Sequence, residues 1–232
     1  MKVPPEHWTN CIEDADVYFF LSEMFNEPEG GKLLEIGSHD ESAEATQIFT
    51  KLGYKVIAVD LREPSDDRAG IDYQYLRHDF CDLPLDFIKE HAGTFDAAYS
   101  ISALEHFGLG TYREGPMNWY YDVIACRQTW QLLKEGGSFY VTVPYGRTFL
   151  DLVPYWRVYD EKALQQRIVQ DFTVLSYGFF FSAWCEDNGK LLQKGHAYTK
   201  AEADQYPGHP PHCTSIVRMK KISKNRLAPD GR

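Results

Sequence analysis

The sequence predicts an α/β fold with a mostly parallel, seven-stranded sheet, helices on both faces and a C-terminal antiparallel hairpin. Three observations support this prediction. Residues 33–60 have the pattern of a strand, a helix and a second strand. Strand and helix patterns then alternate as far as residue 143. Two further apolar segments, 172–184 and 213–221, are separated by a polar loop at 186–211 and are expected to pair as the hairpin.

The first strand–helix–strand unit contains the most informative residues of the chain. An apolar strand at 33–36 leads into a turn at Gly37, and the second strand at 55–59 ends on Asp60. In such units a carboxylate at the end of the second strand binds ribose hydroxyls, while the ligand lies across the first turn. Dinucleotide enzymes usually have three glycines in this turn, which here has one. A ligand with a ribose but no diphosphate therefore fits better.

Further elements are expected in order along the chain. An apolar helical pattern at 12–26 predicts an N-terminal helix. The remaining predicted elements are a helix at 41–52, a strand at 73–77, a helix at 84–91, a strand at 95–100, a helix at 117–134, a strand at 137–143 and a helix at 160–169.

Composition restricts the class of protein. A chain of 232 residues with 44% hydrophobic residues can bury one large core. The net charge of −10 would repel a nucleic-acid backbone. The sequence has no long apolar run and no signal-peptide pattern at its start, so we expect neither a membrane span nor export. Five scattered cysteines without CxxC spacing favour reduced thiols and a cytoplasmic location.

Five motifs carry a family resemblance. The segments LEIGS (34–38), VIAVD (56–60), HDFCDLP (78–84), FDAAYSISALEHF (95–107) and LLKEGGSFYVTV (132–143) resemble, in order, motifs of class I S-adenosylmethionine-dependent methyltransferases. The resemblance implies a Rossmann-like fold, S-adenosyl-L-methionine as the cofactor and methyl transfer as the reaction. The first motif departs from the family at His39 and Glu41, where glycine is usual.

The resemblance also suggests a domain organisation. We expect a single methyltransferase domain over residues 1–223, followed by a disordered tail at 224–232. Within the domain we expect an N-terminal helical cap at 1–30, a cofactor-binding core at 31–145, and a substrate-side region that completes the sheet at 146–223.

The resemblance implies a set of cofactor-binding residues. Asp60 is expected to bind the ribose, and Asp79 with Phe80 the adenine. The alternative for Glu35 is a water-mediated structural acid, and Asp82 is expected to cap the helix that follows it. The full set of expected cofactor residues is Glu35, Gly37, Ser38, Asp60, Leu61, Asp79, Phe80 and Ser100.

A histidine and a glutamate are the catalytic candidates. His106 and Glu105 directly follow the strand at 95–100, at the edge where open α/β sheets bind ligands. Imidazole exchanges protons near neutral pH, so His106 is a candidate general base. Glu105 is expected to orient it or to act as the alternative base. In the family this pair is also often architectural, which is the competing interpretation.

Arginine and aromatic side chains are concentrated on the expected acceptor side. Guanidinium groups suit carboxylates and phosphates, so these residues favour an anionic acceptor. The alternative is that each arginine pairs with one of the chain's many acids. The expected acceptor-binding residues are Arg113, Tyr145, Arg147, Trp156 and Arg157.

The sequence favours a small-molecule acceptor, with no nucleic-acid or membrane partner. The Asn-Pro-Pro-Tyr type motif that marks amino-group methylation in the family is absent, so O-methylation of an anionic or sugar-like metabolite is favoured. Two alternatives remain: a nicotinamide-dependent oxidoreductase and a non-catalytic binding subunit with this fold. His209, His212 and Cys213 lie close together, but a rigid His-Pro-Pro-His turn is the more common interpretation. No metal is expected.

Overall fold

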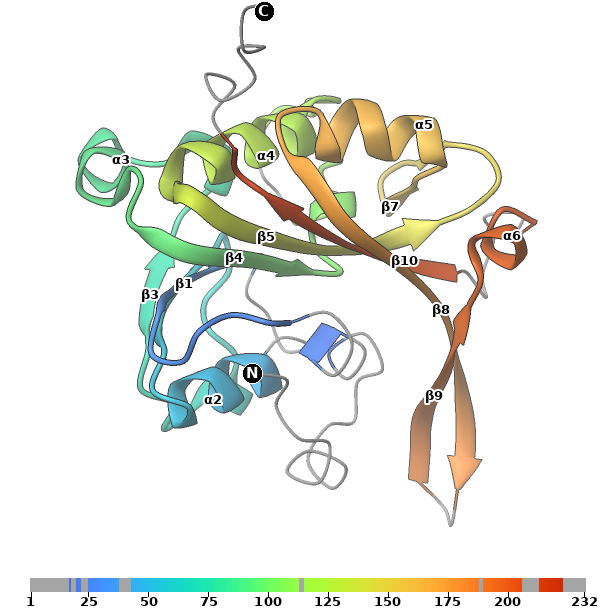
Figure 1. Cartoon of the computed structure of the whole chain (residues 1–232), viewed down its shortest axis with the longest axis horizontal. Coiled ribbons are helices and arrows are strands. Elements are labelled where there is room, and N and C mark those ends of the chain that lie inside the picture. The colour runs from blue at the N-terminus through green and yellow to red at the C-terminus, as the bar shows by residue number, and fades with distance from the viewer. Residues whose placement is uncertain are drawn as a thin grey trace, which may run out of the picture.

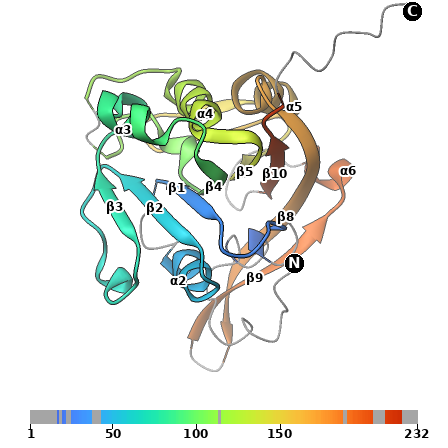
Figure 2. The same cartoon turned by 60° about the vertical axis from the view of Figure 1, so that its left-hand side comes forward.

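A computed structural model describes residues 17, 20–21, 25–37, 43–112, 115–187, 190–205 and 213–222 of the chain. Its main sheet has eight strands in the order β3-β2-β1-β4-β5-β10-β8-β9 (Figures 1 and 2). These strands are β1 (Lys32–Ile36), β2 (Lys55–Asp60), β3 (Gln74–Arg77), β4 (Phe95–Ile101), β5 (Leu133–Tyr145), β8 (Thr173–Asp187), β9 (Lys190–Tyr198) and β10 (Cys213–Lys220).

Helices cover both faces of this sheet (Figure 1). The α-helices are α2 (Ala43–Lys51), α3 (Leu85–His91), α4 (Tyr121–Leu132), α5 (Glu161–Ala163) and α6 (Lys200–Ala203). Short 3-10 helices are η4 (Asp66–Arg68), η5 (Phe80–Asp82) and η6 (Leu104–His106), and the π-helical η7 (Leu164–Val169) continues α5. Alternate residues of each strand face opposite sides, so Leu34 packs in the core beneath α4 and Leu33 in the core beneath α2.

The core on the α2 side is built largely from aromatic rings. Phe25 and Phe49 have ring centroids 4.5 Å apart, and Phe20 stacks on Tyr99 at 5.6 Å. Phe20 and Phe25 belong to the predicted N-terminal helix, most of which lies outside the described residues. These two side chains do pack against the sheet, as the apolar pattern predicts.

The predicted α/β class and the C-terminal antiparallel pair are confirmed, and one strand is added. β8 and β10 pair antiparallel, while β9 occupies part of the segment expected to be a loop. The outer part of the β8–β9 hairpin extends beyond β10 as a two-stranded ribbon (Figure 1). The dipeptide Asn188-Gly189 is a strong hairpin signal that the sequence prediction left unused.

Two other local predictions need correction. The helix expected at 117–134 begins only at Tyr121 and ends at Leu132, where β5 starts. Between β5 and α5, two short antiparallel strands, β6 (Leu150–Leu152) and β7 (Trp156–Val158), form a separate small sheet. Within the part of the chain that the structure describes, no helix has the length and apolarity needed to cross a membrane.

A buried ion pair connects four elements near the end of β1. The Arg68 guanidinium, from η4, lies 2.6 Å from the Glu35 carboxylate, and both side chains are 1% exposed. Thr46 and Tyr99 also donate hydrogen bonds to this carboxylate, at 2.5 Å and 3.1 Å. A buried charge is stable only when it is paired and hydrogen-bonded, and here both conditions hold. The network therefore fixes β1, α2, η4 and β4 to one another.

Replacing Arg68 by methionine should strongly destabilise the protein, because it leaves the Glu35 carboxylate buried without its counter-ion. We expect the free energy of unfolding in urea to fall by about 3–5 kcal/mol. Arg127→Met is the matched control, since that side chain is 61% exposed and lies 3.7 Å from Asp171. The control should cost no more than about 1 kcal/mol. Equal losses in the two variants would contradict a structural role for the buried pair.

Candidate active site

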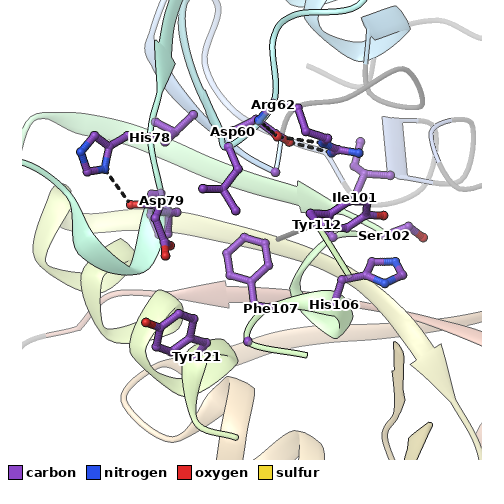
Figure 3. A pocket seen from close by; sticks show the side chains of 16 residues that line it. Asp60, Arg62, His78, Asp79, Ile101, Ser102, His106, Phe107, Tyr112 and Tyr121 are labelled. Carbon is purple, nitrogen blue, oxygen red and sulfur yellow. Dashed lines mark hydrogen bonds and ion pairs between the residues drawn. The ribbon is translucent and has the colours of Figure 1, made fainter. Parts of the chain in front are cut away.

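A pocket opens at the carboxyl ends of β1, β2, β3 and β4, where the chain order in the sheet reverses between β1 and β4. It holds about 800 Å³ of empty space, its open mouth included. Figure 3 shows Asp79 and Tyr121 at one end of the pocket and His106 and Tyr112 at the other. The lining residues are Gly37, Val59, Asp60, Leu61, Arg62, His78, Asp79, Phe80, Ile101, Ser102, Ala103, His106, Phe107, Gly108, Tyr112 and Tyr121.

The backbone at the floor of the pocket is tightly constrained. Gly37 has φ +72°, and a Cβ atom there would collide with the Cβ of Ala103. Its N–H donates to the Val59 carbonyl at 3.0 Å, which fixes the turn after β1 against β2. Ser102 has φ 44°, a left-handed conformation that a non-glycine residue rarely adopts, and its N–H donates to Thr142 Oγ1 at 2.8 Å. Such outliers cluster at functional sites.

Asp60 ends β2 and presents its carboxylate to the pocket. Arg62 binds this carboxylate through its backbone N–H and Nε, both to Oδ1 at 2.8 Å and 2.9 Å, and through Nη2 to Oδ2 at 2.7 Å. Burial lowers the pKa of Arg62, but hydrogen bonding to Asp60 and its negative charge outweigh this and raise the pKa. The Arg62 guanidinium therefore stays charged.

One end of the pocket is apolar with an acid beside it. Leu61, Phe80 and Phe107 line it, and Asp79 Oδ1 accepts a hydrogen bond from the N–H of Cys81 at 2.8 Å, which caps η5. The expectation that Asp82 caps the next helix is wrong, because α3 begins after Pro84 without any side-chain cap.

His106 lies at the other end with its ring orientation fixed. Its Nδ1 lies 2.5 Å from the carbonyl oxygen of Tyr155, on the turn between β6 and β7. A carbonyl can only accept, so Nδ1 carries the hydrogen, and in the neutral ring Nε2 carries the lone pair. Nε2 lies 4.0 Å from Glu105 Oε1. Glu105 is 2% exposed and does not line the pocket, so it can act on His106 but not directly on a substrate.

Two of the expected cofactor residues lie outside this pocket. Glu35 is held in the buried network by its ion pair with Arg68 and does not line the pocket. Ser100 is 1% exposed within β4, and the neighbouring Ile101 and Ser102 line the pocket in its place. Ser38 lies outside the described residues.

The expected acceptor-binding residues are mostly structural. Arg157 is fully buried: its Nε lies 3.1 Å from Asp151, and Nη1 donates to the Phe107 carbonyl at 2.7 Å. The prediction that it binds the acceptor is therefore wrong. Tyr145 donates to Asp204 at 2.7 Å, away from the pocket.

The remaining acceptor candidates do not line the pocket either. Trp156 is partly buried in β7, and Arg147 is exposed on the turn after β5. Arg113 lies outside the described residues, as do His209 and His212. Among the described residues, no three histidine, cysteine or acidic side chains are grouped as metal ligands would be.

Several residues that line the pocket were not predicted from the sequence, among them Arg62, Ser102 and Tyr121. Arg62 follows Asp60 by two positions, a spacing at which an aspartate commonly accepts a hydrogen bond from the backbone, so this contact could have been anticipated. Ser102 and Tyr121 gave no such signal, because the first depends on an unusual backbone angle and the second on how α4 docks.

Comparison with known sequences gives limited information. Residues 72–185, slightly under half of the chain, match the family model described as Caenorhabditis protein of unknown function, DUF268. No curated protein sequence matches the chain significantly.

Solved structures show the fold clearly. A 1,6-didemethyltoxoflavin-N1-methyltransferase from Burkholderia thailandensis has a TM-score of 0.55 at 15% identity, over 94% of this chain and 82% of that one. A SAM-dependent methyltransferase from Thermotoga maritima has a TM-score of 0.53 at 13% identity, over 89% of this chain and 88% of that one. The [4+2]-cyclase SpnF has a TM-score of 0.53 at 15% identity, over 84% of this chain and 75% of that one.

These likenesses confirm the predicted fold class. The order of the sheet, with one antiparallel strand inserted next to β5, and the pocket at the carboxyl ends of β1 to β4 agree with it. The chain has the Rossmann-like fold of class I S-adenosylmethionine-dependent methyltransferases.

Proposed function

We propose that this protein is an S-adenosylmethionine-dependent methyltransferase acting on a small molecule. The observation that carries the proposal is one pocket lined by Gly37, Asp60 and His106 at the carboxyl edge of this fold. These three residues provide, in turn, close approach to the backbone, a carboxylate for a ribose, and a proton acceptor. Similarity to solved methyltransferases adds support.

The residues present suit this cofactor. Leu61, Phe80 and Phe107 offer apolar surface for an adenine ring, and Asp60 can accept hydrogen bonds from ribose hydroxyls. Gly37 lets the methionine end lie close to the chain. Asp60 and Asp79 would repel a diphosphate, which counts against the alternative of a nicotinamide dinucleotide.

When bound, S-adenosylmethionine would supply a methyl group from its sulfonium: an in-line nucleophile would bond to the methyl carbon as the carbon–sulfur bond breaks and S-adenosylhomocysteine leaves. The protein needs no covalent intermediate for this, so most of the acceleration comes from holding both reactants in near-attack geometry. His106 Nε2 accepts the proton of an acceptor hydroxyl. The Tyr155 carbonyl then holds the Nδ1–H of the imidazolium, and the Glu105 carboxylate at 4.0 Å stabilises its charge.

The acceptor that we propose is the hydroxyl of an anionic or sugar-like metabolite. O-methylation is favoured because a hydroxyl needs the base that His106 provides. The burial of Arg157 removes one of the arginines that suggested an anion, but Arg62 brings a guanidinium into the pocket itself.

A cytoplasmic location also belongs to the proposal. Cys81, Cys126 and Cys213 are free thiols. Burial is the main cause that raises the pKa of each thiol, so they stay protonated and unreactive, as in a protein of a reducing compartment.

The alternative of another class is a non-catalytic subunit that uses this fold to bind a partner. The likeness to a [4+2]-cyclase shows that the fold alone does not determine the reaction. Methyl transfer from labelled S-adenosylmethionine to a pool of small hydroxyl compounds distinguishes the two, because a binding subunit transfers no label.

Asp60→Ala should weaken the binding of S-adenosylhomocysteine, measured by titration calorimetry, by at least about tenfold. The physical reason is the loss of hydrogen bonds from ribose hydroxyls to a charged acceptor, worth about 1.5–3 kcal/mol each. A wild-type protein that binds a nicotinamide dinucleotide more tightly than S-adenosylhomocysteine would overturn the assignment.

His106→Gln should lower kcat about a hundredfold or more, because general-base catalysis contributes on the order of 10²–10⁴-fold. S-adenosylhomocysteine affinity should remain close to that of the wild type. Turnover within about threefold of the wild type would exclude His106 from proton transfer and leave catalysis to proximity alone. Gln165→Leu is a control, since this exposed side chain hydrogen-bonds Tyr177 at 2.5 Å and does not line the pocket.

A further inference from the structure

Most arginines near the pocket already have a structural partner. Arg68 pairs with Glu35, and Arg167 lies 2.7 Å from Asp122. Arg157 is buried against Asp151 and two backbone carbonyls. Among the described residues, Arg62 is the one arginine that lines the pocket. Within the part of the chain that the structure describes, Arg62 is therefore the guanidinium that faces the ligand.

The bonds to Asp60 conflict with a ribose. A carboxylate accepts about four hydrogen bonds, two on each oxygen. Arg62 supplies three of them, two at Oδ1 and one at Oδ2. One hydrogen-bonding position is left on the Asp60 carboxylate, whereas the two hydroxyls of a vicinal diol need two. Two ribose bonds can form only if the Arg62 guanidinium leaves, while its backbone N–H keeps the carboxylate in place.

The Arg62 guanidinium also contacts the Tyr112 ring, and this second contact determines where the guanidinium stays once it leaves Asp60. The Arg62 Cζ lies 4.3 Å from the centroid of the Tyr112 ring, a cation–π distance, and Tyr112 contacts His106 edge-to-face at 5.5 Å between centroids. Figure 3 shows Arg62 between Asp60 and Tyr112, with His106 beyond Tyr112. Tyr112 therefore keeps the guanidinium at the His106 end of the pocket.

We propose that Arg62 is the acceptor-binding residue, released from Asp60 when the cofactor's ribose binds, and that the acceptor carries a carboxylate or phosphate. This inference rests on the proposed function and specifies its substrate class. The free guanidinium fork pairs with the anion, which places the acceptor hydroxyl beside His106. Cofactor and anion then bind cooperatively, because each favours the state in which Arg62 has left Asp60.

The test measures S-adenosylhomocysteine affinity by calorimetry in potassium chloride and in potassium phosphate of equal ionic strength. Wild-type affinity should rise about threefold or more in phosphate, since the anion stabilises the released guanidinium. Arg62→Met keeps the backbone N–H bond to Asp60 but removes the guanidinium. In chloride it should bind S-adenosylhomocysteine about threefold or more tighter than the wild type, and phosphate should have no effect on it.

The control is Arg127→Met, which removes one positive charge outside the pocket. Arg127 is 61% exposed, lies 3.7 Å from Asp171 and does not line the pocket. This variant should behave as the wild type in both salts.

Three outcomes would overturn the inference. Weaker S-adenosylhomocysteine binding by Arg62→Met would mean that Arg62 positions Asp60 and does not compete with the ribose. An equal phosphate effect in wild type and variant would mean an adventitious ion only, and no phosphate effect in the wild type would remove the anionic acceptor. A wild-type protein that binds no S-adenosylhomocysteine defeats the proposed function instead, so the two failures are distinguishable.

Discussion

The parallel pairing of β1 with both β2 and β4 is the constraint on which the site depends. Its register sets Ile36 opposite Val59 and Glu35 opposite Tyr99. The residues at the carboxyl ends of these strands, Gly37, Asp60 and Ser102, therefore emerge together at one edge, although they are distant in sequence. The buried Glu35–Arg68 pair joins β1 to η4 in the same region.

Two arginines fix the acceptor-side loops. The fully buried Arg157 donates to the carbonyl of Phe107, and the partly buried Arg167 binds Asp122 at the start of α4. Both guanidiniums pair with protein acceptors, which offsets the cost of removing them from water. In an acidic chain these arginines give the loop between η6 and α4 its shape, and they add no positive charge to the pocket.

The sequence predicted what depends on local pattern. Alternating strands and helices gave the fold class, and Asp60 was located because its position follows from one strand–helix–strand unit. Glu35 was predicted to bind the cofactor, because no local sequence pattern shows that Arg68, 33 positions later in the chain, pairs with its carboxylate.

Side-chain direction could not be read from the sequence. Arg157 lies on the predicted side of the sheet but points into the core, because the short β6–β7 sheet that carries it was not predicted. The turn between these two strands supplies the Tyr155 carbonyl that contacts His106. Because the β6–β7 sheet was not predicted, the orientation of this candidate base could not be predicted either.

The hydrogen bond between His106 and the Tyr155 carbonyl bears on which reaction the site can carry out, a question that the fold alone does not answer. Proteins with this fold include methyltransferases and a cyclase, so the fold alone leaves the reaction undetermined. In the proposed function, the reaction depends on the His106 end of the pocket. A histidine that only filled space would need no fixed tautomer. Here the bond from Nδ1 to the Tyr155 carbonyl leaves the lone pair of the neutral ring on Nε2, and the buried Glu105 carboxylate lies 4.0 Å from Nε2. An imidazole held in this way can accept a proton without first reorienting, which is the requirement for activating a hydroxyl beside a sulfonium.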